Sequence, residues 1–377
     1  KVGGDGKAGV GRNSDTVETE TIGINELIEL IRSTTKIPER SLAGDSPLFM
    51  SIDHCFPIKG KGTVLTGTVM SGTAKVGDTV EFPELTLERK VKSIQMFHRS
   101  VETASQGDRC AVLVKDLNAK LIERGLVVTP GSVKKLHGAV VLVRKVKYFQ
   151  RPCPSNSKIH ITIGHSTILS SVIFFGGDEL RSLAKECVGK QLPNVDFDAS
   201  KDWPYDEELR AGGKNAGGPV LQWALLLFET PCMCQDTSMV IGSRLDLDIN
   251  VKACRIAFYG KIALSLSPDD IADLSKFKIY KSKERDCGVD RITDSHNVIG
   301  KNLLSKESDL SRVIGLKVYT KDNDEGRIES SFGKTGKFKI YFPNGVTKPV
   351  QKGDTLKMPL KKFVFALQED KKKLLQG

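Results

Sequence analysis

The segment from Lys59 to Val80 reads Lys-Gly-Lys-Gly-Thr-Val-Leu-Thr-Gly-Thr-Val-Met-Ser-Gly-Thr-Ala-Lys-Val-Gly-Asp-Thr-Val, and it decides the fold. Its Val and Thr residues favour strands, and Gly beside a polar residue marks a turn. The pattern therefore predicts an antiparallel hairpin with a further tight turn at Gly77-Asp78. Similar short apolar runs recur about every ten residues over residues 47–135, which predicts a small antiparallel β-barrel.

The same pattern continues toward the C-terminus. It predicts a second barrel over residues 136–276 and a third, smaller barrel over residues 277–370. An acidic, Gly-rich segment at 177–219 shows no periodicity, so we expect it to be a surface insertion in the second barrel. With 377 residues the chain can bury several cores. We therefore predict an all-β fold of three consecutive β-barrels, followed by a basic tail at 371–377.

A different pattern precedes the barrels. Residues 1–21 are rich in Gly and poor in apolar residues, which predicts a flexible linker. Within residues 22–46, Ile24, Leu27, Ile28 and Ile31 recur at helical spacing, which predicts one amphipathic helix and a connector.

The charge of the chain indicates a polyanionic partner. The sequence has 57 Lys and Arg against 46 Asp and Glu, a net charge of +11. The excess is concentrated in the three expected barrels, and residues 136–176 contain no acidic residue at all. Clustered positive charge favours nucleic acid as the partner over a diffuse effect on solubility.

Several classes of protein are excluded or disfavoured. There is no apolar window long enough for a membrane span and no signal sequence, so we expect no membrane partner. Eight Cys are too few for a disulfide scaffold, and Cys232 and Cys234 form a lone C-x-C, which favours reduced thiols over a metal site. These features predict a cytoplasmic protein, with the nucleus as a second compartment.

Common catalytic signatures are missing from the sequence. It contains no phosphate-binding loop, nucleophile elbow, zinc-binding helix or dinucleotide fingerprint. We therefore assign no catalytic residue, and the chain alone is expected to bind rather than to catalyse.

Two ordered motifs carry a resemblance to a known family. The segment from Lys59 to Val80, and the run Gly107-Asp-Arg-Cys-Ala-Val-Leu-Val114 followed by Leu121-Ile-Glu-Arg-Gly-Leu-Val-Val128, resemble domain II of the elongation factor Tu family of translational GTPases. Within it the chain is most similar to the eukaryotic selenocysteine-specific elongation factors, on the stretches Met50–Gly60, Val91–His98, Ile159–His165, Val240–Asp246 and Gly336–Ile340.

The resemblance implies how the chain is organised. The three barrels would be domains II, III and IV, and the helix in 22–46 would be the last helix of a GTPase domain that is otherwise missing. It implies no cofactor in this chain, with GTP and magnesium bound by the missing domain of an intact GTPase.

The resemblance also implies a selenocysteine pocket at Asp53, His54 and Arg109, with Asp108 near the aminoacyl end of the tRNA. A selenol is an anion at neutral pH, whereas serine is neutral, so a fixed cation would favour selenocysteine. Adjacent residues of a regular strand face opposite sides, so the pocket requires a β-bulge or a strand end at Asp53 and His54. The alternative is a surface ion pair beside a half-buried histidine.

Two further basic groups are candidate contacts. The resemblance implies that domain III grips the stems of a tRNA, and the candidates are Arg144, Lys145, Lys147, Arg151 and Lys158; the alternative is a basic strand edge. In domain IV, Lys334, Lys337 and Lys339 can share one face that meets RNA or the protein that recruits the selenocysteine insertion element. The alternative there is a solvated face.

Together these expectations predict a monomeric elongation factor. It would bind selenocysteinyl-tRNA and deliver it to the ribosome at UGA codons, in a GTP-dependent manner in the intact protein. Two other interpretations stay open from the sequence: another translational GTPase of the initiation or release type, and a non-enzymatic RNA-binding module.

Overall fold

The computed structural model describes residues 23–36, 46–187, 191–212, 220–235, 238–248, 250–303, 313–332, 336–348 and 350–365. The chain divides into two units, residues 1–46 and 47–377. In the first, helix α1 (Ile24–Thr34) forms as predicted, with no buried residue. The expected linker 1–21 and the basic tail 371–377 lie outside the described residues. No helix in the described ranges is long and apolar enough to cross a membrane.

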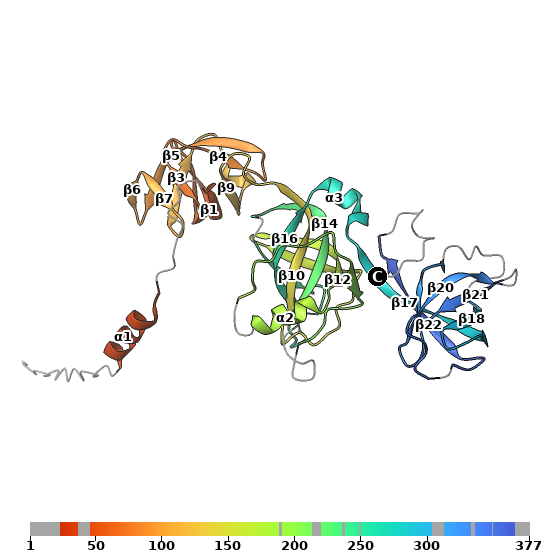
Figure 1. The fold of residues 1–377 in the computed structure, drawn as a ribbon. Coiled ribbons are helices and arrows are strands. Elements are labelled where there is room, and N and C mark those ends of the chain that lie inside the picture. Colours follow the sequence, from red (N-terminus) through yellow and green to blue (C-terminus); the bar gives the residue numbers. More distant parts are fainter. Residues whose placement is uncertain are drawn as a thin grey trace, which may run out of the picture. The chain divides into compact units, whose positions relative to one another are not determined.

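Domain II is the predicted barrel. Its sheet order is β4-β9-β1-β2-β8-β5-β6, and an additional pairing of β4 with β5 closes the ring (Figure 1). A core of buried residues that includes Met50, Leu65, Phe82 and Val112 fills it. Its elements are β1 (Phe49–Ile58), β2 (Gly62–Ser71), β3 (Thr73–Lys75), β4 (Thr79–Phe82), β5 (Leu87–Met96), β6 (Arg99–Val101), β7 (Thr103–Ser105), β8 (Arg109–Val114), η1 (Ala119–Leu121) and β9 (Gly125–Val128).

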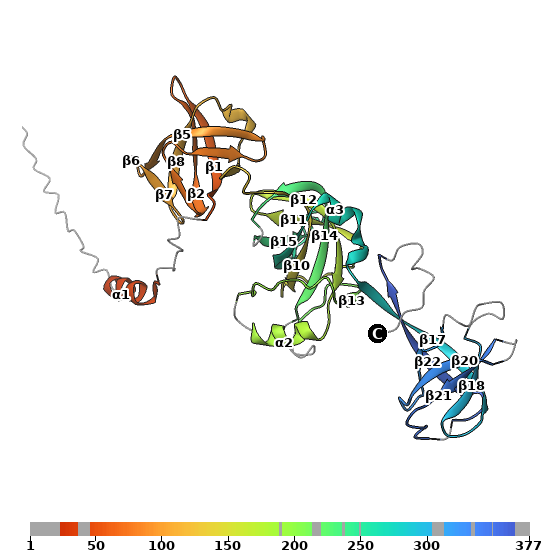
Figure 2. The same ribbon diagram turned by 45° about the horizontal axis from the view of Figure 1, so that its top comes forward.

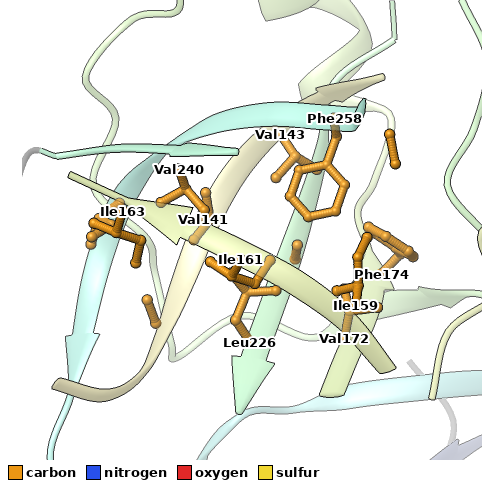
Figure 3. Close-up of a cluster of buried hydrophobic side chains, with 14 of the residues drawn as sticks. Val141, Val143, Ile159, Ile161, Ile163, Val172, Phe174, Leu226, Val240 and Phe258 are labelled. Carbon is orange, nitrogen blue, oxygen red and sulfur yellow. The ribbon is translucent and has the colours of Figure 1, made fainter. Parts of the chain in front are cut away.

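Domain III is a second closed barrel. Its strands follow the order β11-β15-β16-β10-β14-β12, and β12 pairs back onto β11. Figure 3 shows aliphatic side chains and the rings of Phe174 and Phe258 filling its interior, with the two rings packed edge to face at 5.9 Å. The strands are β10 (Lys135–Lys145), β11 (Ser157–Ile163), β12 (Ser166–Phe175), β14 (Gln222–Met233), β15 (Met239–Ser243) and β16 (Ile256–Leu266).

The prediction of a surface insertion at 177–219 is wrong for the described part of that segment. It forms helix α2 (Glu179–Glu186) and strand β13 (Trp203–Asp206). Leu180, Trp203 and Trp223 are buried in one cluster with Phe277, outside the barrel interior. Strand β13 pairs antiparallel with β12 and parallel with β17, so the segment is a structural layer that joins the second and third barrels. The isolated apolar residues that it buries are too irregularly spaced to show a period.

Domain IV follows α3 (Pro268–Ala272) and η3 (Leu274–Lys276). Its strand order is β17-β18-β21-β20-β19-β22, and β17 pairs with β22 to close the ring. The strands are β17 (Ile279–Ile292), β18 (Asn297–Lys301), β19 (Lys317–Tyr319), β20 (Glu325–Phe332), β21 (Lys337–Tyr341) and β22 (Thr355–Phe363). The all-β fold of three consecutive barrels after one helix is therefore confirmed.

Candidate functional site

Strand β1 contains the bulge that the pocket requires. Ile52 pairs with Gly67 and His54 pairs with Thr66, so Asp53 has no partner on β2. Before the bulge the buried residues are Met50 and Ile52; after it, Cys55 packs against the same core. The register of inward and outward side chains therefore shifts by one, and both Asp53 and His54 lie on the outer side of the barrel.

Gly67 makes this bulge possible. A Cβ atom built on Gly67 would lie 1.9 Å from the backbone oxygen of Ser51 and 3.1 Å from Cε of Met50. Atoms do not approach so closely, so only glycine permits β2 to pass this near to the bulged strand.

Arg109 meets Asp53 across three strands. Arg109 pairs with Thr68 on β2, and Thr68 pairs with Ser51 on β1, two residues before the bulged Asp53. Nη1 of Arg109 donates a hydrogen bond to Oδ2 of Asp53, and the two side chains are 60% and 38% exposed. His54 lies exposed beside them. The fold thus brings together the three residues predicted for the pocket.

Asp108 has a structural role in the turn that starts β8. Its Oδ2 accepts a hydrogen bond from the backbone N–H of Ser105 at 2.8 Å, and its carbonyl accepts one from Val69 at 3.0 Å. Gly107 supplies the positive φ of 89° that this turn needs. Asp108 therefore fixes where β8 begins, and with it the position of Arg109.

An apolar row lies next to this group, and the sequence pattern does not predict it. Phe56 pairs with Val64, which pairs with Leu113 on β8. Phe56 is 44% exposed, and Ile58 on the same strand is 38% exposed. Between this row and Arg109 lies the row of His54, Thr66 and Ala111. Only the shift of register at the bulge puts Phe56 and Ile58 on the outer face, so the sequence pattern could not reveal them.

Arg144 is separated from the other predicted stem residues. Its Nη2 donates a hydrogen bond to the carbonyl of Cys187 at the end of α2, at 3.2 Å, and its Nε is buried without a partner in the described residues. The neighbouring Lys145 lies on the opposite side of β10, 5.8 Å above the ring of Phe149. The prediction that Arg144 contacts a tRNA stem is not tested by this arrangement, in which Arg144 packs onto the end of α2 and not beside Lys145.

The other four stem candidates stay accessible. Lys147 and Arg151 are exposed, and Lys158 forms an ion pair of 2.6 Å with Glu229. Burial raises the pKa of the Cys153 thiol to about 11, while the nearby charges of Arg244 and Lys145 oppose that rise. Arg244 is therefore a further cation at this end of the barrel. Its guanidinium binds the carboxylate of Asp246 twice, at 2.8 and 3.0 Å, and holds the pKa of Asp246 at about 2.

The basic face predicted for domain IV is neutralised by acids. Lys337 and Lys339 lie on the same side of β21 as expected, but Lys337 pairs with Asp290 at 2.7 Å and Lys339 with Glu329 at 2.9 Å. Lys334 lies outside the described residues. The two described lysines are therefore both paired with acids, although Lys337 shares Asp290 with Lys301, which lies 3.4 Å from that carboxylate.

Comparisons with known proteins agree with this arrangement of domains. Residues 62–129 match the family model of elongation factor Tu domain 2. Residues 140–260 match the third domain of the eukaryotic selenocysteine-specific elongation factor, and residues 275–375 match the eEFSec C-terminal RIFT domain.

Two curated relatives are both called selenocysteine-specific elongation factor. The mouse protein is 40% identical over 351 residues, which is 88% of this chain and 59% of the relative. The protein of Methanocaldococcus jannaschii is 26% identical over 336 residues, 88% of this chain and 64% of the relative. The chain thus spans about three fifths of the length of these relatives.

The solved structures show the same fold. The apo form of elongation factor SelB from Methanococcus maripaludis matches with a TM-score of 0.61 and 23% identity, over 90% of this chain and 67% of that one. The form with the GTP analogue GppNHp matches with a TM-score of 0.63 and 24% identity, over 90% and 68%. Through its three barrels, the chain therefore belongs to the family of selenocysteine-specific elongation factors, whose C-terminal domains it contains.

Proposed function

We propose that this chain is the tRNA-holding part of a translation elongation factor that binds selenocysteinyl-tRNA and delivers it to the ribosome. Family membership supports the choice of substrate class, and the group of Asp53, His54 and Arg109 supports the specificity. The phosphate-binding loop is missing from the sequence, so we assign GTP and Mg²⁺ no ligands in this chain. They would be bound by a GTPase domain joined to it, in a cytoplasmic protein.

The Arg109 guanidinium carries the proposal. Arginine has five N–H donors and stays charged at any physiological pH. One nitrogen of Arg109 is held by Asp53, and its other N–H groups have no partner among the described residues. Asp53 therefore orients the guanidinium and leaves donors open on an exposed surface. A selenolate can accept from these donors, whereas a neutral serine side chain offers no charge.

His54 and the apolar row complete the pocket. His54 lies on the same outer face and can donate a second hydrogen bond to the selenolate. Leu113 lies four residues after Arg109 on β8, about 13 Å along the strand at 3.3 Å per residue. We propose that the base of the terminal nucleoside of the tRNA packs against this apolar row of Phe56, Val64 and Leu113.

The basic end of domain III suits the stems of the same tRNA. Double-stranded RNA is recognised through its shape and its phosphates, which needs accessible cations rather than base-reading groups. Lys145, Lys147, Arg151 and Lys158 remain candidates for these contacts. Ribosome binding and recruitment by the selenocysteine insertion element, or by the protein bound to it, remain part of the proposal for the intact factor.

The test is the substitution Arg109→Asn in the intact factor, with Arg291→Asn as the matched control. Arg291 is an exposed arginine of domain IV. Two unit charges about 4 Å apart interact by about 1 kcal/mol in water and about 4 kcal/mol near a protein surface. Because Arg109 is 60% exposed, we expect a loss of about 2 kcal/mol, or roughly 30-fold, in the preference for selenocysteinyl-tRNA over seryl-tRNA.

The measurement is equilibrium binding of both charged tRNAs to each variant. A preference that is unchanged in Arg109→Asn refutes the pocket. An equal loss of affinity for both tRNAs indicates a general RNA contact and also refutes selenolate recognition. If Arg109→Asn and Arg291→Asn change the preference between the two tRNAs equally, the net charge of the protein and not the position of Arg109 determines that preference.

A further inference from the structure

The ribbon formed by β17 and β22 separates its charges onto two faces. Residues 281–288 of β17 pair with residues 355–362 of β22, and Figure 2 shows the two strands side by side. Because side chains alternate along a strand, Lys281, Lys283 and Arg285 share one face, and Glu284 and Asp286 share the other. The alternation therefore sorts cations from carboxylates.

The cations of this face reach solvent, although the partners of Lys283 and Arg285 across the ribbon, Leu360 and Met358, are buried in the core of domain IV. Lys283 and Arg285 are exposed and have no ion-pair or hydrogen-bond partner among the described residues. Lys362, directly opposite Lys281, is a further exposed cation on this face. Among the residues that the structure describes, Lys281 alone of the four has a partner: it pairs with Glu207 at 2.9 Å and lies 3.9 Å from the centre of the Tyr205 ring, and Glu207 is itself 77% exposed. This ribbon face thus holds unneutralised charge, in contrast to the lysines of β21.

The other face is neutralised internally. Lys357 pairs with Glu284 at 2.9 Å, and Lys361 pairs with Asp202 at 2.7 Å while it lies 4.7 Å above the ring of Tyr280. A partner attracted by charge would therefore approach from the side of Lys283 and Arg285.

The edge of β17 is also open along this stretch. On the side away from β22, β17 pairs with β13 only at Ile279 and Tyr280, and with β18 only from Gly288 onward. Between these points the described strands leave the edge of β17 uncovered. The three cations of β17 repeat about every 6.6 Å along this edge, which is close to the separation of successive phosphates on a nucleic acid strand.

We propose that this cationic ribbon face of Lys281, Lys283, Arg285 and Lys362 binds the phosphate backbone of double-stranded RNA. The face has evenly spaced cations and no exposed aromatic residue among them, which suits contacts to a backbone rather than stacking on unpaired bases. The inference goes beyond the proposed function because it concerns domain IV and needs no aminoacyl group. It moves the expected RNA contact of domain IV from β21 to the ribbon.

The test compares two double variants of the full chain. Lys283→Gln with Arg285→Gln removes the two unpaired cations of β17. Lys321→Gln with Lys352→Gln removes two exposed cations elsewhere in domain IV and is the matched control, because both variants lose two charges. The probe is a blunt 20-base-pair RNA duplex, and binding is measured by fluorescence anisotropy from 0.05 to 0.3 M salt.

The expected result follows from counterion release. Each phosphate contact contributes about 0.9 to the slope of log K against log salt, so the ribbon variant should lose about 1.8 from that slope. If binding at 1 M salt is unchanged, affinity at 0.1 M salt falls by roughly 60-fold. The slope of the control variant should differ from that of the parent by less than about 0.45, the contribution of half a phosphate contact. The variant Lys283→Arg should bind as tightly as the parent.

Several results would overturn the inference. The first is that the parent chain does not bind the duplex, and the second is that the two double variants lose equal affinity. The third is a ribbon variant that binds as tightly as the parent, which is expected if these cations only protect a strand edge. Equal or tighter binding of single-stranded RNA, or of polyglutamate, at the ribbon would overturn the commitment to a duplex. Circular dichroism of every variant excludes misfolding. A loss of duplex affinity in Lys283→Arg would also count against the proposal.

The source of the RNA is decided by a second set of probes. Uncharged selenocysteine tRNA, a ribosomal RNA hairpin and a messenger stem-loop are compared under the same conditions. The one whose affinity responds most to the ribbon variant is the source. Failure of the selenocysteine pocket is tested separately with Arg109→Asn, whose effect requires an aminoacyl group.

Discussion

Replacing Gly67 with alanine should destabilise domain II and disrupt the Asp53 bulge together. The new Cβ would lie 1.9 Å from the Ser51 oxygen, so the two strands must separate by at least about 1.1 Å to reach a 3.0 Å contact. Overpacking of this kind costs about 1–3 kcal/mol, and the short contact places it at the upper end. Lengthened hydrogen bonds around the bulge add about 1 kcal/mol.

The unfolded chain offsets part of this cost. Alanine has fewer unfolded conformations than glycine, which stabilises the folded state by about 0.4–1 kcal/mol. The net expectation is a loss of about 3 kcal/mol. Amide exchange in β1, β2 and β8 should then be roughly 150-fold faster, because every 1.4 kcal/mol is tenfold.

Hydrogen exchange followed by mass spectrometry of peptides is the assay, since it resolves the domains of one chain. Peptides from β10 and β14 of domain III are the internal reference. Gly288→Ala is the matched control, because a Cβ there meets nothing closer than the Lys301 side chain at 3.7 Å. Exchange in β1 and β2 within threefold of the parent in Gly67→Ala would refute the argument that close approach sets the bulge.

Two further outcomes test the structure away from the pocket. Asp206 is only 6% exposed and accepts a 2.6 Å hydrogen bond from Gln222 besides its ion pair with Arg210. Asp206→Ala should therefore lower the free energy of unfolding by about 3 kcal/mol. Urea unfolding followed by the fluorescence of Trp203 and Trp223 measures this, and a loss below about 1 kcal/mol would contradict it. The Lys276 ammonium and the Ser267 backbone N–H lower the pKa of Asp270 from 3.8 to about 2, so this carboxylate stabilises the fold above pH 4 and loses that effect as the pH falls toward 2. Asp270→Asn should remove this acid-dependent part of stability in urea titrations between pH 4 and pH 2, and an unchanged pH slope would show that the interaction is not significant.

Much of the fold could be predicted because its signals are local. The turn at Gly77-Asp78 and the strand propensity of the Val and Thr residues from Thr63 to Met70 depend only on neighbouring residues, so they are visible in the sequence. The packing of the segment 177–219 could not be predicted, because Leu180 and Trp203 are isolated apolar residues that become core only when three parts of the chain meet.

The candidate site could be predicted in its residue types but not in its geometry. The resemblance pointed to Asp53, His54 and Arg109, and the alternation of a regular strand showed that a bulge was required. The place of Phe56 beside them followed only from the observed register. Residue type likewise could not show that Lys337 is neutralised by Asp290, which lies on another strand.

The sequence alone determined the class of fold, the three barrels and the composition of the candidate pocket. The tertiary structure decided which cations are free, which face of β1 carries His54, and that the acidic segment joins two barrels. Turn and strand propensities act between neighbours in the chain, whereas strand register and charge pairing depend on residues that meet only after folding.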